Sequence, residues 1–229
     1  MFNKDLQNYL EGFVSETRMK RIKEVVSNRT RHVTIILEDI WQAQNASAAI
    51  RTSEAMGLQE LHIIKNGDGY KINKQVVKGA NKWIEINKYS NHLNNTETCL
   101  KQLKDRGFKI VATVPAENSQ LLTNLDVNCK TAFVFGSEKN GVSNDVLNLC
   151  DSKISIPMFG FTESYNISVS VAISLFHVIH ELKKQNINYK LSEVEQNDLL
   201  HKWTKQSIKK CELLVQEFFT KHGGKKEPG

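Results

Sequence analysis

Cysteine is scarce in this sequence, and its placement excludes the common uses of cysteine clusters. The 229 residues contain four cysteines, and no two of them form a Cys-x-x-Cys pair. Zinc sites and disulfide-rich scaffolds both need cysteines at short, regular spacings. We therefore expect no metal site, and we expect reduced structural thiols at Cys99, Cys129, Cys150 and Cys211.

Long hydrophobic runs and a signal sequence are also lacking. No stretch approaches the roughly 18 consecutive apolar residues that suggest a membrane-spanning helix. The first segment, MFNKDLQNYLEGF, has charges of both signs and no apolar core of signal-peptide length. The sequence thus predicts an intracellular, cytoplasmic protein with no membrane partner.

Glycine-rich nucleotide-binding motifs are absent as well. The sequence has no Gly-x-Gly-x-x-Gly. The spacing Gly136-x-x-x-x-Gly141 is followed by Val142, where a phosphate-binding P-loop needs lysine. These absences argue against a generic nucleotide-binding α/β protein.

Positive charge is concentrated at the two ends of the chain. The formal net charge is +6; residues 1–31 hold seven Lys and Arg against four Asp and Glu, and residues 183–229 hold ten against six. Basic ends suit a protein that grips a polyanion, because each cation placed at a phosphate releases condensed counterions. Lysine-rich ends can also serve solubility alone, and charge does not decide between the two.

Between these ends, short β-branched runs alternate with helical stretches. This order is typical of a parallel sheet covered by helices, an α/β domain with crossover connections. The predicted strands are Val33–Leu37, Leu61–Ile64, Trp83–Ile86, Lys109–Val114, Thr131–Phe135 and Ile154–Ile156. The predicted helices are 46–56, 92–106, 143–149 and 166–184.

The terminal segments have the apolar spacing of amphipathic helices. Residues 1–31 predict a helix or a helix pair, and the apolar stripe from Leu199 to Phe218 predicts a helical C-terminal segment after a linker at Asn186–Lys190. We therefore expect three parts: an N-terminal helical extension (1–31), an α/β domain (32–186) and a C-terminal helical extension (187–229).

Three polar segments lie where the pattern otherwise calls for core or turn. In the first, Asn45-x-x-Ala48-x-x-Arg51, the asparagine is a favourable cap for the helix and the arginine lies about 120° away around it. A capped helix with a surface arginine explains this segment equally well, so alone it is weak evidence.

The other two segments follow strands directly. Phe135-Gly136-Ser137-Glu138 places glycine and a carboxylate at a strand end, where α/β proteins bind ligands. Ile156-Pro157-Met158 leads through a loop to Ser164, Asn166 and Ser168 at a helix start. Helix capping alone could explain the latter polar residues, but two polar strand ends together favour a site.

Taken in order, the three segments resemble the motifs of a known family. Asn-x-x-Ala-x-x-Arg-Thr, Phe-Gly-x-Glu-x-x-Gly and Ile-Pro-Met-x-Gly-x-x-x-Ser-x-Asn-x-Ser are similar to the three motifs of the SpoU (TrmH) family of RNA ribose 2′-O-methyltransferases in the SPOUT superfamily. The match covers roughly residues 31–182. The short helical flanks resemble the tRNA guanosine-2′-O-methyltransferase branch, with a D-loop guanosine of the position-18 type as target.

The resemblance implies a set of site residues and a cofactor, S-adenosylmethionine. The residues that it assigns to the catalytic centre are Arg51, Asn45, Glu138, Ser164 and Asn166. The residues that it assigns to cofactor contacts are Thr113, Gly136, Ile156, Met158 and Tyr165. Arginine is effectively always protonated in proteins, so we expect Arg51 to bind a phosphate and stabilise the developing alkoxide rather than act as a base.

The resemblance also implies a C-terminal trefoil knot and a homodimer, and both helical extensions would then bind tRNA. Candidate contacts to the RNA backbone are Arg18, Lys20, Arg21, Lys23, Lys209 and Lys210. The alternatives are the same chemistry on rRNA, or a non-catalytic RNA-binding protein of the same fold.

Overall fold

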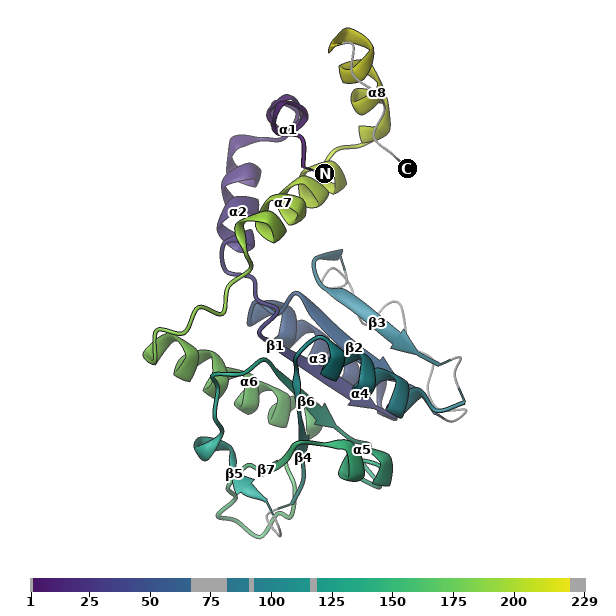
Figure 1. Ribbon diagram of the computed structural model, residues 1–229, viewed down its shortest axis with the longest axis vertical. Helices are drawn as coiled ribbons and strands as arrows, with labels where there is room; N and C mark the ends of the chain where they lie inside the picture. The colour runs from purple at the N-terminus through teal and green to yellow at the C-terminus, as the bar shows by residue number, and fades with distance from the viewer. Residues whose placement is uncertain (1, 67–81, 91–92, 116–118, 223–229) are drawn as a thin grey trace. The chain divides into compact units, whose positions relative to one another are not determined.

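The structure, a computed structural model, divides the chain into two compact units (Figure 1). It describes residues 2–66, 82–90, 93–115 and 119–222. One unit is formed by Thr30–Tyr189 and the other by Met1–Arg29 together with Lys190–Gly229. The two predicted extensions are therefore parts of the same unit, although they lie at opposite ends of the sequence.

A parallel sheet forms the centre of the Thr30–Tyr189 unit, as predicted. Within the described residues it has seven strands in the order β3-β2-β1-β6-β4-β7-β5, and every pairing is parallel. The strands are β1 (Val33–Glu38), β2 (Glu60–Ile64), β3 (Glu85–Tyr89), β4 (Lys109–Thr113), β5 (Gln120–Leu121), β6 (Thr131–Phe135) and β7 (Ser152–Ser155). Because Leu37 lies opposite Phe135, the loops after β1 and β6 begin side by side.

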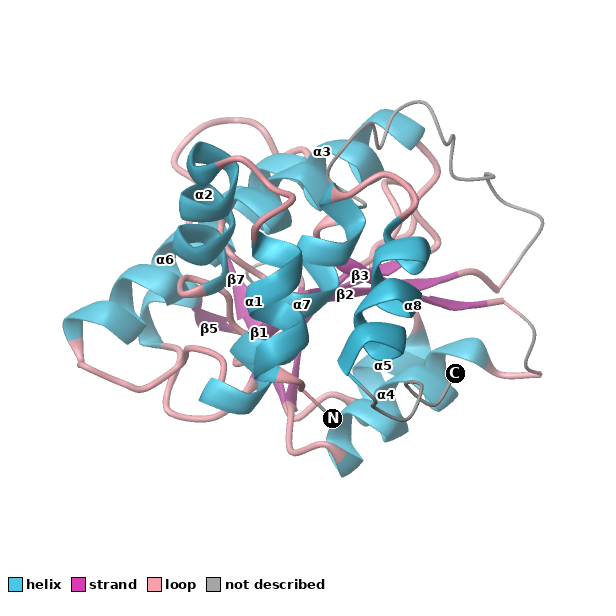
Figure 2. Cartoon of the chain, turned by 90° about the horizontal axis from the view of Figure 1, so that it is seen from above, coloured by secondary structure: helices cyan, strands magenta, loops and turns pink. Residues whose placement is uncertain are grey.

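Helices cover both faces of the sheet (Figure 2). Successive side chains of a strand point to opposite faces, so Ile35 and Ile36 enter different cores. Helices α3 (Ala43–Ala55) and α6 (Ile167–Lys184) pack on the Ile35 face, while α4 (Asn95–Asp105) and α5 (Asn144–Leu149) pack on the other. A short 3-10 helix, η2 (Leu122–Asn124), follows β5.

Some predicted boundaries are wrong because strand pairing, not local pattern, sets the ends of strands. The strand predicted at Trp83–Ile86 is Glu85–Tyr89, since it pairs along the whole of β2. The strand predicted at Ile154–Ile156 is Ser152–Ser155, which pairs with β4. Strand β5 has only two exposed residues and was not predicted, because so short a segment carries no apolar pattern.

The second unit consists of α1 (Lys4–Glu11), α2 (Glu16–Val26), α7 (Glu193–Ser207) and α8 (Cys211–His222). Leu6 and Leu10 of α1 pack with Cys211 and Phe218 of α8. The predicted C-terminal stripe is divided between two helices, because α7 ends where Ile208 is extended, and Lys210, with φ +55°, precedes the start of α8. In the described part of the chain, no helix is long and apolar enough to cross a membrane.

Candidate functional site

The loop after β6 presents Glu138 on a tight turn. Ser137 and Gly141 exchange two backbone hydrogen bonds of 2.9 Å, and Glu138 lies between them. Gly136 must be glycine, because an added Cβ would lie 2.0 Å from the carbonyl carbon of Gly141 and 2.2 Å from the nitrogen of Val142. This close backbone approach fixes the turn that carries the carboxylate.

Donors from the neighbouring β1 loop surround the Glu138 carboxylate. The backbone N–H of Trp41 donates to Oε2 at 3.0 Å and that of Gln42 to Oε1 at 3.2 Å. The side-chain amide of Asn45 also donates to Oε1, at 2.8 Å. Partial burial raises the pKa of Glu138, but these hydrogen bonds outweigh it, so the net pKa lies below the ordinary value. Glu138 is therefore an ionised acceptor that orients its donors.

Asn45 joins all three predicted motifs. It lies in the first turn of α3 with only 6% of its surface exposed. Its Nδ2 donates to Glu138, and its Oδ1 accepts a 2.9 Å hydrogen bond from Asn166 Nδ2. Asn166 caps α6 by accepting from the backbone N–H of Ser168. Two amides and one carboxylate thus form a chain of hydrogen bonds across the ends of β1 and β6 and the start of α6.

Two predicted catalytic residues stand apart from this chain of hydrogen bonds. Arg51 lies two turns further along α3 and is exposed, and within the described residues it has no ion pair. Ser164 is exposed in the loop before α6. Both side chains are open to a bound molecule, whereas Asn45, Glu138 and Asn166 hold one another in place.

The five predicted cofactor contacts come from neighbouring strand ends. Thr113 ends β4, Gly136 follows β6 and Ile156 follows β7, and these three strands are adjacent in the sheet. The Thr113 hydroxyl donates to the carbonyl of Val134 at 2.8 Å, which ties the ends of β4 and β6. Tyr165 donates to the carbonyl of Pro157 at 3.3 Å, so the loop from Ile156 to Tyr165 closes on itself.

Sequence reasoning missed the part played by the backbone of Trp41 and Gln42. Their N–H groups bind Glu138, but a backbone donor leaves no signal in residue type. Gln42 also accepts from Asn45 Nδ2 at 3.2 Å through its side chain. No residue type in this segment signals the two donors, and the non-helical conformation of Gln42 before α3 is known only from the structure.

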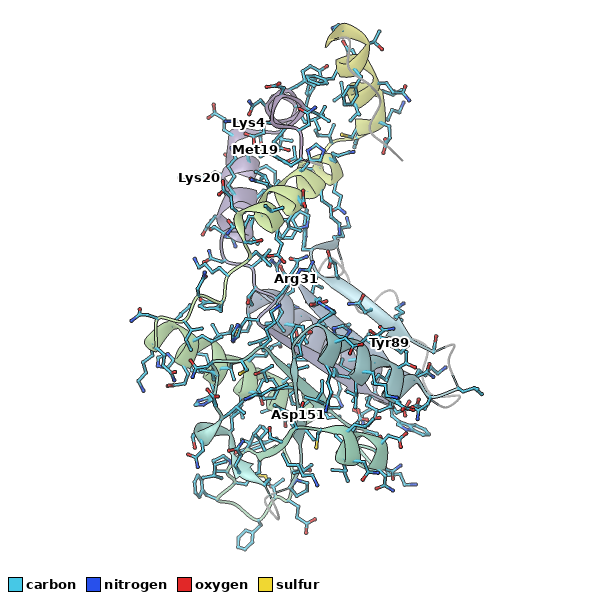
Figure 3. All side chains as sticks on the ribbon, viewed as in Figure 1. Lys4, Met19, Lys20, Arg31, Tyr89 and Asp151 are labelled. Atoms are coloured by element: carbon cyan, nitrogen blue, oxygen red, sulfur yellow. The ribbon has the colours of Figure 1, made fainter. Side chains whose placement is uncertain are left out.

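The predicted RNA contacts on the helical unit differ in their ionic surroundings. Arg21 pairs with Glu24 at 2.9 Å, and Lys23 pairs with Glu11 at 2.6 Å. Lys20 lies on the exposed side of α2, whereas its neighbour Met19 is buried on the side that faces α7 (Figure 3). Lys209 and Lys210 are exposed at the break between α7 and α8.

Known proteins resemble this chain over most of its length. Residues 32–176 match the SpoU rRNA Methylase family. A tRNA (guanosine(18)-2'-O)-methyltransferase of Borreliella burgdorferi is 40% identical over 205 residues, which cover 90% of this chain and 92% of that protein. The protein of the same name from Aquifex aeolicus is 32% identical over 87% of this chain and 94% of its own length.

Solved structures share the fold. The crystal structure of the Aquifex aeolicus TrmH/SpoU tRNA modifying enzyme has a TM-score of 0.73 and 32% identity, covering 85% of this chain and 98% of that one. The SpoU methyltransferase AviRb from Streptomyces viridochromogenes, solved in complex with AdoMet, has a TM-score of 0.60 at 19% identity, covering 68% and 62%. The second likeness concerns the fold alone.

Proposed function

This chain belongs to the SpoU rRNA methylase family, and we propose that it transfers a methyl group from S-adenosylmethionine to the ribose 2′-hydroxyl of a D-loop guanosine in tRNA. The observation that carries the proposal is the joining of three family motifs through Asn45. The relatives that match nearly end to end are named for tRNA and guanosine 18, which favours tRNA over rRNA.

The residues at the strand ends fit the proposed cofactor. S-adenosylmethionine supplies the methyl group when bound. Thr113, Ile156 and Met158 are half-buried, so they offer one hydroxyl and two apolar side chains to an adenosine, and the bend at Gly136 leaves backbone groups near them. Tyr165 would contact the cofactor from the loop after β7, where its hydroxyl already donates to the carbonyl of Pro157. Such a mixture of apolar side chains and a few polar groups is usual for small-molecule sites.

Positioning supplies most of the proposed catalysis. The 2′ oxygen must lie in line with the methyl group, so that the new O–C bond would form as the bond from that methyl group to sulfur breaks; the thioether would leave and the hydroxyl proton would pass to solvent. Exposed Arg51 binds a phosphate of the RNA and stabilises negative charge on the 2′ oxygen. Asn45, held by Glu138, and Asn166, held by Asn45, shape the pocket for the ribose, and Ser164 contacts the substrate from the loop before α6.

We also propose that the chain has a trefoil knot and acts as a cytoplasmic homodimer. The knot is what the resemblance to the SpoU family implies. Val169 and Phe176 are exposed apolar residues of α6, 42% and 64% accessible, which supports a partner subunit at this helix. All four cysteines are free thiols, as is usual in a reducing compartment.

The direct test uses labelled S-adenosylmethionine with unmodified tRNA and, in parallel, rRNA, followed by mapping of the modified nucleotide. We expect label only in tRNA, as a ribose-methylated guanosine of the D-loop. Label in rRNA alone would establish the rRNA alternative. Cofactor binding without transfer to either RNA would support the non-catalytic alternative.

The helical unit should determine how tRNA binding depends on salt. We expect the triple variant Lys20→Gln, Lys209→Gln, Lys210→Asn to weaken tRNA binding and to flatten the slope of log K against log[salt] by about one for each phosphate that the variant no longer binds. Asparagine is chosen at residue 210 because it tolerates the positive φ there. Arg21 and Lys23 should contribute less, because each already has a carboxylate partner.

A matched control neutralises three cations on the sheet unit, Lys101, Lys104 and Lys109. Each pairs with a carboxylate of α4 or of a neighbouring loop. The control changes the net charge equally, so we expect its salt slope to stay that of the wild type. Equal slopes for all three proteins would exclude the helical unit from RNA binding.

A further inference from the structure

A second glutamate, outside the three motifs, lies beside the site and is buried. Glu38 is the last residue of β1 and is 2% exposed. Its Oε2 accepts from the backbone N–H of Ser143 at 2.8 Å, and its Oε1 accepts from the hydroxyls of Ser143 and Thr96, both at 2.7 Å. Three donors therefore converge on one buried carboxylate.

The contacts of Glu38 mirror those of Glu138. Glu38 extends from the end of β1, where the β1 loop begins, to the backbone of Ser143 in the β6 loop. Glu138 extends from the β6 loop to the backbone of Trp41 and Gln42 in the β1 loop. The two loops are thus linked twice, in opposite directions, and we call Glu38, Ser143, Glu138 and the N–H groups of residues 41 and 42 the clasp.

We infer that Glu38 is a positioning residue of the methyl-transfer site, which holds the turn of Glu138 against the start of α3. The inference rests on the proposed function, but only its kinetic test requires that function. Asn45 depends on Glu138 for its orientation, and Asn166 depends on Asn45. If the β6 loop were displaced, Glu138 would move with it, and Asn45 and Asn166 would lose their orientation in turn.

Burial of a carboxylate is a costly way to build a core. Within the described residues Glu38 has no ion-pair partner, and all of its contacts are neutral donors. An apolar residue at the end of β1 could fill the space without that cost. A carboxylate is suited instead to fixing a backbone N–H and a helix cap, since Ser143 also caps α5 by accepting from Val146 at 3.3 Å.

The test compares Glu38→Ala with Glu38→Gln. We expect Glu38→Ala to lower kcat about 10- to 100-fold with tRNA affinity within about twofold of wild type, because small displacements of positioned groups cost that much. Glu38→Gln should keep most of the activity, since its amide oxygen can accept from Ser143 N–H while its NH₂ group donates to the hydroxyls.

Hydrogen exchange provides a readout that needs no activity. In Glu38→Ala the amides of Trp41 and Gln42 should exchange at least about tenfold faster, although Glu38 touches neither residue. Unchanged exchange at these amides, or an unchanged kcat, would overturn the inference. If the wild-type protein methylated no RNA, the proposed function would be refuted. The exchange experiment would still show whether Glu38 holds the β1 loop in place through the clasp.

Two comparisons separate positioning from general stability. Glu60→Gln alters another buried glutamate, at the opposite end of the sheet, where Glu60 pairs with Arg31 and Arg106. We expect it to lower the melting temperature and leave kcat unchanged. The double variant Glu38→Ala, Glu138→Ala should lose no more than the worse single variant, because both act through one loop; multiplied losses would contradict a shared action.

Discussion

Replacement of Arg51 by alanine should lower kcat for tRNA methylation about 10²- to 10³-fold, the loss typical of removing a group that stabilises developing negative charge. Arg51 is exposed on α3 and makes no ion pair among the described residues, so the guanidinium is available to the RNA. Arg51→Lys should still cost at least about tenfold, because a point charge does not replace the planar, bidentate fork. Single-turnover rates at saturating substrates measure both effects.

The matched control for this prediction is Arg106→Lys. Arg106 caps the end of α4 and pairs with Glu60, away from the motif residues, and its replacement keeps the charge. We expect its single-turnover rate to equal that of the wild type. Near-normal turnover of Arg51→Lys would refute both an electrostatic and a basic role for Arg51.

Gly136→Ala should abolish methyl transfer and destabilise the sheet unit. The new Cβ would meet the backbone of Gly141 and Val142 at 2.0–2.2 Å, so the turn that carries Glu138 must move. Overpacking of this kind costs about 3 kcal/mol, which corresponds to a fall of roughly 6–12 °C in melting temperature. Calorimetry together with a methyl-transfer assay would measure the two losses separately.

Gly12→Ala is the control for Gly136→Ala. Gly12 follows α1 with φ −63°, and an added Cβ would make only an ordinary 3.4 Å contact with the carbonyl of Tyr9. Its melting temperature should be unchanged or slightly raised, since alanine restricts the unfolded chain. If Gly136→Ala behaved in the same way, the close approach of the two backbone segments would not be essential.

The sequence predicted the parts of the site that depend on residue type. Asn45, Glu138 and Asn166 were selected as polar residues at strand and helix ends, and the structure brings them into contact. The binding of Glu138 by backbone N–H groups was not predictable, because every residue other than proline carries that donor. Glu38 was not predicted, because a polar residue at the end of an apolar strand is ordinary and gives no sign of burial.

The fold, too, was predictable where it depends on local sequence pattern and not where it depends on contacts between distant segments. Apolar periodicity identified six strands and the helices between them, but pairing partners moved the ends of β3 and β7. The division of the C-terminal stripe follows from the extended backbone at Ile208 and the positive φ at Lys210, which periodicity does not detect. The association of α1 with α8 joins residues about two hundred positions apart, so no local pattern could predict it.

The union of both ends in one helical unit sets an order of folding during synthesis. Helices α1 and α2 leave the ribosome first, but Leu6 and Leu10 can pack with Cys211 and Phe218 only when α8 has been made. All of Thr30–Tyr189 emerges in between and can fold as a domain of its own. A nascent chain therefore assembles its sheet before its helical unit, and the proposed tRNA-binding surface matures only after the sheet.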